Sequence, residues 1–315
     1  MYHAGVRAAQ SEILKTHSQL TFQEAGFRYS LKYAPGRVTY SATNGVNSET
    51  AGALWAFGAG KIAQTYVLEK GGAYIEGRVS YYTKLGSLDI TPGHSATPPQ
   101  DVEDALGQKM DGDTARRCFS CHTTAAVTSR VFESEKAIPG VRCEACHGPG
   151  ARHVEAMNAG EDDQSPATIM NPKYLPPSDS VDFCGACHRT WADVAVEMPT
   201  YIGDTSLRFQ PYRLEKSRCW KESGDARIIC IACHDPHRPL DHELSDYDSK
   251  CLACHSAKPE SRGQKAMNTA CRVGTSNCVS CHMPKYEVPH LHATFTDHYI
   301  RVIRPNESDH GVPLP

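Results

Sequence analysis

The stretch that decides the fold is Gly140-Val-Arg-Cys-Glu-Ala-Cys-His-Gly-Pro-Gly150, which contains one Cys-x-x-Cys-His motif. The same motif occurs six times and uses twelve of the 14 cysteines in the 315-residue chain. Random placement at this composition gives about 0.03 copies, so the repetition is not accidental. The copies are Cys118-Cys121-His122, Cys143-Cys146-His147, Cys184-Cys187-His188, Cys230-Cys233-His234, Cys251-Cys254-His255 and Cys278-Cys281-His282.

This spacing is the pattern of covalent haem attachment. Two thiols add to the two vinyl groups of one haem, and the histidine that follows becomes the proximal iron ligand. Zinc sites also use Cys-x-x-Cys pairs, but they have no reason to place a histidine after every second cysteine. A redox-active Cys-x-x-Cys would occur once rather than six times. The sequence therefore predicts six covalent heme c groups, with His122, His147, His188, His234, His255 and His282 as proximal ligands.

The rest of the chain falls into two parts. Residues 1–19 predict a short helix, and residues 20–92 alternate in the manner of strands, with a hairpin at Gly71-Gly72. From about residue 93 apolar periodicity fades and the haem motifs begin, so the porphyrins are expected to replace a side-chain core. We predict an α+β protein of low secondary-structure content. Its N-terminal helix plus β-rich domain spans residues 1–92, and a hexahaem domain of short helices and loops spans 93–315. The motif residues themselves are expected to form helical turns, since the histidine must point back over the porphyrin that both cysteines hold.

Longer strings around the motifs resemble a family of exported multihaem c-type cytochromes, many of them fused to tetratricopeptide repeats. The resemblance covers most of the chain. It rests on Trp55-Ala-Phe-Gly-Ala-Gly60, Gln64-Thr-Tyr-Val67, Arg78-Val-Ser-Tyr-Tyr82, Arg117-Cys-Phe-Ser-Cys-His-Thr-Thr124, residues 140–150 followed by His153, Ser217-Arg-Cys-Trp220, Cys233-His-Asp-Pro-His237, Cys281-His-Met-Pro-Lys285 and Phe295-Thr-Asp-His298.

Two departures from that family are visible. Similar proteins often carry another haem motif just upstream of a segment like Met1-Tyr-His-Ala-Gly5, and none is present here. No 34-residue helical period follows residue 300, so the repeats are also absent. Residues 1–20 lack the apolar core of a signal peptide, and we therefore expect a mature or truncated chain.

Ten further histidines are candidates for the second axial ligand of each haem iron. Six haems with two axial histidines each need six more, so the supply suffices. The resemblance implies His153, His237, His292 and His298 as distal ligands. His153 lies six residues after His147 and His237 three after His234, too close to reach the opposite face of their own haems, so each is expected to serve a neighbouring haem. His17 and His94, which rest on weaker matches, complete the predicted set. His3, His242, His290 and His310 are reserves, and Met283, which follows a motif directly, is expected to pack against a ring.

Composition and chemistry limit the compartment and the partners. A net charge of −3 gives no sign of a nucleic-acid binder, and no run of 18 apolar residues encodes a membrane span. Haem is attached to such motifs outside the cytoplasm, so we expect an exported protein, periplasmic or extracellular. The two remaining cysteines, Cys219 and Cys271, favour a disulfide over two buried thiols in that setting.

These features favour an electron-transfer protein over an enzyme. If every iron has two axial ligands, no site remains for a substrate. The expected partners are redox proteins or further copies of the chain in a head-to-tail filament. The alternatives are a multihaem reductase of nitrite or hydroxylamine, which needs one open iron, and an electron-transfer subunit of a membrane-bound complex.

Overall fold

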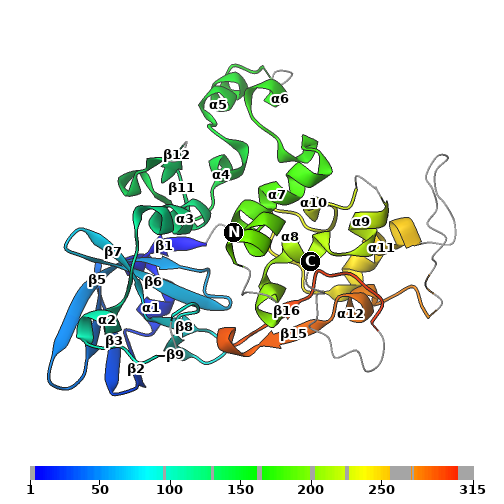
Figure 1. Cartoon of the computed structure of the whole chain (residues 1–315). Coiled ribbons are helices and arrows are strands. Elements are labelled where there is room, and N and C mark those ends of the chain that lie inside the picture. Colours follow the sequence, from blue (N-terminus) through cyan, green and yellow to red (C-terminus); the bar gives the residue numbers. More distant parts are fainter. Residues whose placement is uncertain are drawn as a thin grey trace. The chain divides into compact units, whose positions relative to one another are not determined.

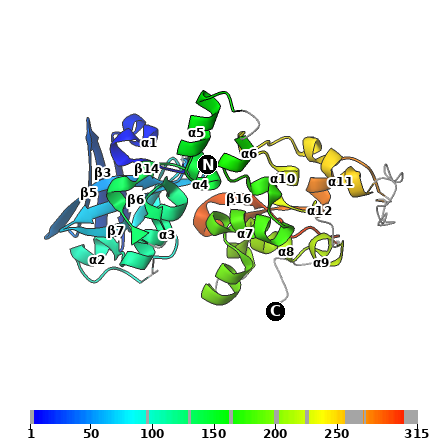
Figure 2. The ribbon, with the colours of Figure 1, turned by 90° about the horizontal axis from the view of Figure 1, so that it is seen from above.

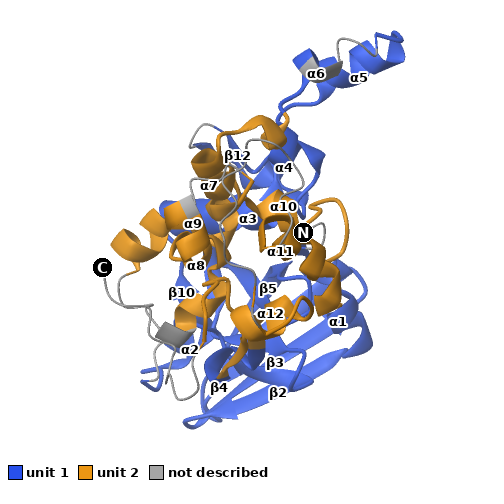
Figure 3. Cartoon of the chain, turned by 90° about the vertical axis from the view of Figure 1, so that its right-hand side faces the viewer, with its two compact units in different colours: residues 1–170, 289–293 blue, residues 171–288, 294–315 orange. Residues whose placement is uncertain are grey.

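The computed structural model describes residues 4–94, 97–128, 131–161, 165–198, 203–223, 227–255, 271 and 273–303. The chain forms two compact units, coloured separately in Figure 3. Unit 1 contains residues 1–170 and 289–293, and unit 2 contains residues 171–288 and 294–315. The division into compact units does not coincide with the predicted boundary at residues 92–93, because the first two haem motifs are counted with the β-rich part. That boundary stays a prediction about domains.

An antiparallel sheet of ten strands, counted over the described residues, forms most of unit 1. Its path runs β10-β7-β6-β5-β4-β3-β2, while β1 pairs with β5 and β8 pairs with β6 and β9. The strands lie together in the views of Figures 1 and 2. Their bounds are β1 Gly5–Arg7, β2 Gln19–Glu24, β3 Phe27–Ala34, β4 Arg37–Thr43, β5 Ser48–Phe57, β6 Ala63–Lys70, β7 Ala73–Gly77, β8 Val79–Tyr82, β9 Ser87–Ile90 and β10 Gly107–Lys109.

The period-2 pattern of the sequence explains this sheet. Phe27, Tyr29 and Leu31 alternate with more exposed neighbours along β3 and enter the main core. Between β6 and β7, Gly71 and Gly72 take positive φ angles of 60° and 80°. Two such residues make the tight turn whose twist matches that of the flanking strands, so the predicted hairpin is confirmed.

The N-terminal prediction was wrong in extent. Instead of one helix over residues 1–19, β1 pairs with β5, and helix α1 spans only Glu12–Thr16. The Arg7 guanidinium lies 3.9 Å from the centroid of the Trp55 ring, and such tertiary contacts outweigh local helix propensity. The Ser11 side chain accepts a hydrogen bond from the Leu14 amide and caps α1.

Short helices make up most of the remaining regular structure in the described residues, in agreement with the predicted fold class. The longest, α7, has 12 residues. The helices after α1 are α2 Val102–Leu106, α3 Gly112–His122, α4 Cys143–His147, α5 Ala151–Asn158, α6 Ser165–Thr168, α7 Pro177–His188, α8 Gln210–Glu215, α9 Arg218–Ser223, α10 Cys230–Cys233, α11 Asp248–His255 and α12 Cys278–His282.

Short strand pairs connect some of these helices. Three two-stranded ladders join β11 Thr123–Thr124 to β14 Ile138–Pro139, β12 Val127–Thr128 to β13 Val131–Phe132, and β15 Lys285–Val288 to β16 Ala293–Thr296.

Of the helices in the described part of the chain, none is both long and apolar enough to cross a membrane.

Candidate haem-binding site

All six Cys-x-x-Cys-His motifs adopt helical turns, as the sequence predicted. Motifs 1, 3 and 5 end the helices α3, α7 and α11, while motifs 2, 4 and 6 form the short helices α4, α10 and α12. Residues three and four apart share one face of a helix. In five motifs the histidine belongs to the same helix, and the spacing places it on one face with the two cysteines, whereas His234 follows α10 with an extended backbone. Attachment to a single porphyrin would need the two thiols and the histidine on the same side.

Three of the motif histidines share one hydrogen-bond pattern. The Nδ1 atoms of His122, His147 and His282 lie 2.6, 2.8 and 2.8 Å from the carbonyl oxygens of Ala4, Met170 and Arg301, respectively. A carbonyl only accepts, so each Nδ1 donates. Metal-binding histidines usually donate their other ring nitrogen in this way, which fixes the tautomer with Nε2 as the metal-binding atom.

Motif 1 is anchored in the core of unit 1. Phe119, between its two cysteines, is 0% exposed, and its ring contacts Trp55 and Phe57 edge-on at centroid distances of 5.4 and 5.1 Å. The His122 ring stacks on Phe57 at 4.6 Å. A Cβ atom at Gly5 would collide with the His122 carbonyl, so β1 approaches this histidine closely. The sheet therefore fixes the position of His122, the predicted proximal ligand of motif 1.

Motif 2 borders an open cavity of about 820 Å³. Cys143, His153, Val154 and Ile169 are among its lining residues. This volume lies within the usual range for a ligand pocket. His153 Nδ1 lies 3.3 Å from Thr168 Oγ1, and the Glu144 carboxylate accepts a hydrogen bond of 2.7 Å from the Gly150 amide. The apolar cavity, an attachment cysteine and a histidine fit a porphyrin.

Motifs 3 and 4 lie side by side in unit 2. The Cys230 thiol lies close enough to Cys184 to lower the pKa of the Cys184 thiol to about 7. The ring centroid of His298 lies 6.1 Å from that of His234. Histidine nitrogens bind transition metals at about 2 Å, so two imidazoles on opposite sides of one iron have centroids roughly 6 Å apart. The observed separation fits a bis-histidine haem at motif 4, with His298 as its distal ligand.

The electrostatics of His298 suit a ligand. Its Nδ1 lies 3.0 Å from the Thr296 carbonyl oxygen and donates to it. Burial lowers the pKa of His298 to about 4, and the neighbouring His234 acts in the same direction. Burial also lowers the pKa of His234. Both rings are therefore neutral near pH 7, which is the form that binds a metal.

Motifs 5 and 6 are joined by a carboxylate. Asp248, at the start of α11, accepts hydrogen bonds of 2.7 and 2.8 Å from the amides of Asn277 and Cys278. These amides lie at the N-terminus of α12, where helix donors are otherwise unpaired. The Cys251 and Cys278 thiols are also close enough to influence each other's pKa. Asp248 therefore links two attachment sites that are far apart in the sequence.

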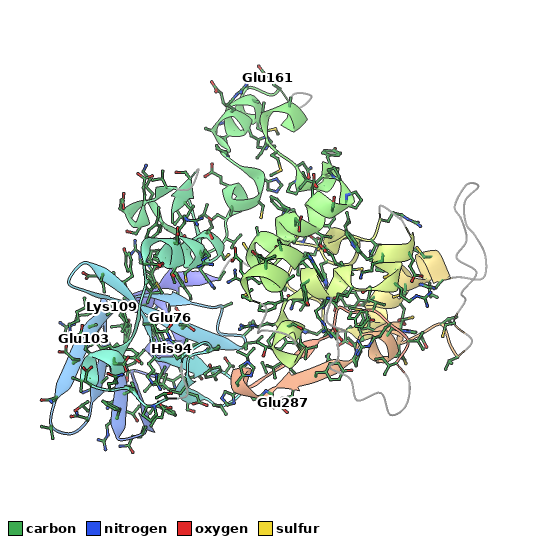
Figure 4. All side chains as sticks on the ribbon, in the orientation of Figure 1. Glu76, His94, Glu103, Lys109, Glu161 and Glu287 are labelled. Atoms are coloured by element: carbon green, nitrogen blue, oxygen red, sulfur yellow. The ribbon has the colours of Figure 1, made fainter. Side chains whose placement is uncertain are left out.

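The other predicted distal histidines lie in varied surroundings. Figure 4 shows His94 beside Glu76 in unit 1. The His94 side chain is 1% exposed, and its Nε2 makes no hydrogen bond but lies 3.4 Å from Glu76 Oε2. This orphaned nitrogen fits a ligand role. His17 is exposed beside the Tyr81 ring, and the His237 side chain is 75% exposed with Nδ1 3.5 Å from Asp235.

His292 is held by a carboxylate in the structure. Its Nε2 lies 2.7 Å from Asp89 Oδ2, and its ring contacts Tyr82 edge-on at 4.8 Å. Axial ligation by this residue would require Nδ1, or release of Nε2 from Asp89.

The predicted disulfide is not formed in this structure. Cys219 and Cys271 are both thiols, and they lie in different environments. Cys219 is partly buried on α9, where burial raises the pKa of its thiol, whereas Cys271 is exposed. His3 and His310 lie outside the described residues.

Sequence reasoning missed the residues that hold His298. Arg213, on α8, donates to both oxygens of Asp297 at 2.8 and 2.6 Å, and both side chains are buried. Burial by itself raises the pKa of Asp297, but the hydrogen bonds and charge of Arg213 outweigh this and hold it below its usual value. The string Phe295-Thr-Asp-His298 contained the only signal, an acidic residue next to a predicted ligand.

Comparisons with known proteins agree with this chemistry. Residues 94–148 match the sequence model of the family "Cytochrome c554 and c-prime". The chain is 26% identical over 234 residues to the multiheme cytochrome MtrA of Shewanella baltica (strain OS185), a match that covers 67% of this chain and 59% of that protein. No solved structure matches. The motifs and the two matches together support a multihaem c-type cytochrome family for this chain.

Proposed function

We propose that this multihaem c-type cytochrome carries electrons along six covalently bound haems, most of them with two axial histidines. The observation that carries the proposal is the placement of buried, neutral His298 across from the motif histidine His234. The iron of each haem would supply the one-electron chemistry. The support from comparison is the similarity to a multiheme cytochrome over 67% of this chain.

The residues of the chain would attach the porphyrins, bind the irons and adjust their reduction potentials. Twelve cysteines hold the porphyrins, and six motif histidines bind the irons from one side. Carbonyl acceptors at Nδ1 would orient three of these rings, His122, His147 and His282, and raise their basicity. Distal histidines close the opposite face, which excludes substrates and favours low reduction potentials. His298, His153, His94, His17, His237 and His292 form the proposed distal set, and the geometry supports His298 best.

Location and partners follow from the haem chemistry. The proposed protein is exported, periplasmic or extracellular, and exchanges electrons with redox proteins or with further copies of itself. In a head-to-tail filament the chain of haems would continue from one subunit to the next. Such contacts join two different surfaces of neighbouring copies and build an open fibre when they do not close into a ring. Loss of axial ligation in isolated monomers would support ligation between subunits, whereas fully ligated monomers would count against it.

The first prediction concerns the unaltered, haem-loaded protein. Mass measurement should show six covalent haems, and the visible, near-infrared and electron paramagnetic resonance (EPR) spectra should show only low-spin, bis-histidine iron. After reduction, carbon monoxide should not bind, because both axial positions are filled. A high-spin haem that binds carbon monoxide would instead indicate an open iron, and a reductase function would replace electron transfer.

The second prediction concerns the cavity beside motif 2. Replacing His153 with alanine should leave six haems attached, because no thiol is changed, and should open one iron to carbon monoxide. Titration of the reduced variant checks the expected stoichiometry of one per chain. The matched control is His242→Ala, which removes an exposed histidine. Equal, negligible binding in both variants would remove His153 from the ligand set.

A further inference from the structure

One short segment touches two of the haem motifs. Within residues 296–301, His298 lies beside His234 of motif 4 at 6.1 Å between ring centroids. Three residues later, the Arg301 carbonyl accepts a hydrogen bond of 2.8 Å from His282 Nδ1 of motif 6. The Arg301 amide also donates to the His282 carbonyl at 3.3 Å. The segment therefore carries the proposed distal ligand of one haem and the acceptor that orients the proximal ligand of another.

The Asp297 carboxylate holds this segment. It is 0% exposed and accepts four hydrogen bonds. Two come from Arg213 at 2.8 and 2.6 Å, one from the Tyr299 amide at 2.9 Å, and one from Arg301 Nη1 at 2.7 Å. The Asp297 amide in turn donates to the Pro284 carbonyl at 2.9 Å, close to the end of motif 6.

A second anchor acts from α9. Ser217, the residue before this helix, donates from Oγ to the His298 carbonyl at 3.1 Å and accepts from the Ile300 amide at 2.8 Å. The backbone on both sides of His298 is therefore tied to unit 2 by side chains that lie about 80 positions earlier in the chain.

Stability alone is a poor explanation for the buried ion pair between Arg213 and Asp297. Burying two charges removes their hydration, and a buried ion pair often contributes no more than apolar residues of similar volume would. What the pair does supply is a fixed geometry, because the two-pronged contact between a guanidinium and a carboxylate allows little rotation.

We propose that Asp297 is a positioning residue shared by two haem sites, setting His298 opposite His234 and the Arg301 carbonyl against His282. The inference rests on the proposed function. Through this one carboxylate, the distal ligand of the motif 4 haem and the proximal ligand of the motif 6 haem are coupled. Loosening the segment should therefore change two haems, whereas removing His298 alone should change one.

The test compares EPR spectra of haem-loaded chains. Asp297→Asn keeps the size of the side chain but removes its charge. We expect two of the six low-spin signals to shift, and carbon monoxide to bind one haem per chain after reduction. His298→Ala should change only the motif 4 signal. A Cys278→Ala/Cys281→Ala chain lacks the sixth attachment and identifies the motif 6 signal by its absence.

Two further variants keep the test decisive. In Arg213→Met/Asp297→Leu both charges of the buried pair are removed together, so neither is left without the other, and Arg301 keeps its 3.1 Å hydrogen bond to the Tyr299 carbonyl. The same two signals should shift. Glu222→Gln breaks the exposed 2.8 Å pair with Arg218 and should shift none. If the folded variants that alter Asp297 change only the motif 4 haem, or no haem, the inference is overturned. An open iron in the unaltered protein would overturn the proposed function instead.

Discussion

In the His298→Ala chain, we expect one iron to bind carbon monoxide after reduction, whereas no iron of the unaltered chain should bind it. The reason is geometric, because His298 lies 6.1 Å from His234 between ring centroids, across the space that an iron with two ligands needs. Alanine removes the only polar group of that side chain and leaves one face of the metal open. A His298→Met chain should remain closed to carbon monoxide and should have a higher reduction potential at one haem.

The measurement is a carbon monoxide titration of the reduced protein, read in the visible spectrum, together with EPR of the oxidised form. We expect about one carbon monoxide per chain and the loss of one low-spin signal, with all haems still attached. His242→Ala is the control, since His242 is exposed. A His298→Ala chain that remains inert to carbon monoxide would falsify the assignment of His298 as a distal ligand.

The Phe119→Ala chain should lose about 3–5 kcal/mol of unfolding free energy, the usual range for a large buried aromatic side chain. Phe119 is 0% exposed and packs against Trp55 and Phe57, so alanine leaves a cavity that these rings cannot easily fill. Because Phe119 lies between the two cysteines of motif 1, the loss also weakens the support for His122.

Guanidinium unfolding of the haem-loaded protein, followed by circular dichroism, measures this change. The control is Val46→Ala, because Val46 is 90% exposed and truncating an apolar side chain there should change stability by less than about 0.5 kcal/mol. Similar unfolding midpoints for the two variants would mean that the haem, rather than the aromatic cluster, supports this motif.

Local patterns were sufficient to predict the fold class, the Gly71-Gly72 hairpin and the helical turns of the motifs. In each case the signal lies within a few neighbouring residues, and the physics that it reflects is local. The extent of the N-terminal helix was wrong because pairing of β1 with β5 is a tertiary contact. The disulfide expected between Cys219 and Cys271 rested on the even number of cysteines outside the motifs and on an oxidising compartment. Neither tells how far apart the two sulfur atoms lie in the folded chain.

The partners of the ligands were harder to predict. Ala4, Met170 and Arg301 act through backbone carbonyls, which every residue possesses, so no residue type marks them. Arg213 and Asp297 are 84 positions apart, and only the folded chain brings them together. The motif predicts where a haem would be attached, whereas the environment of each motif histidine depends on distant segments.

The close approach of β1 to motif 1 has a mechanical consequence. This strand has only three paired residues, and Ala4, just before it, accepts the hydrogen bond from His122. Peeling β1 away from β5, by a pull on the chain or by a competing strand, would remove that acceptor and make His122 a weaker donor to iron. A force that separates β1 from β5 would then shift the reduction potential of the haem proposed at motif 1.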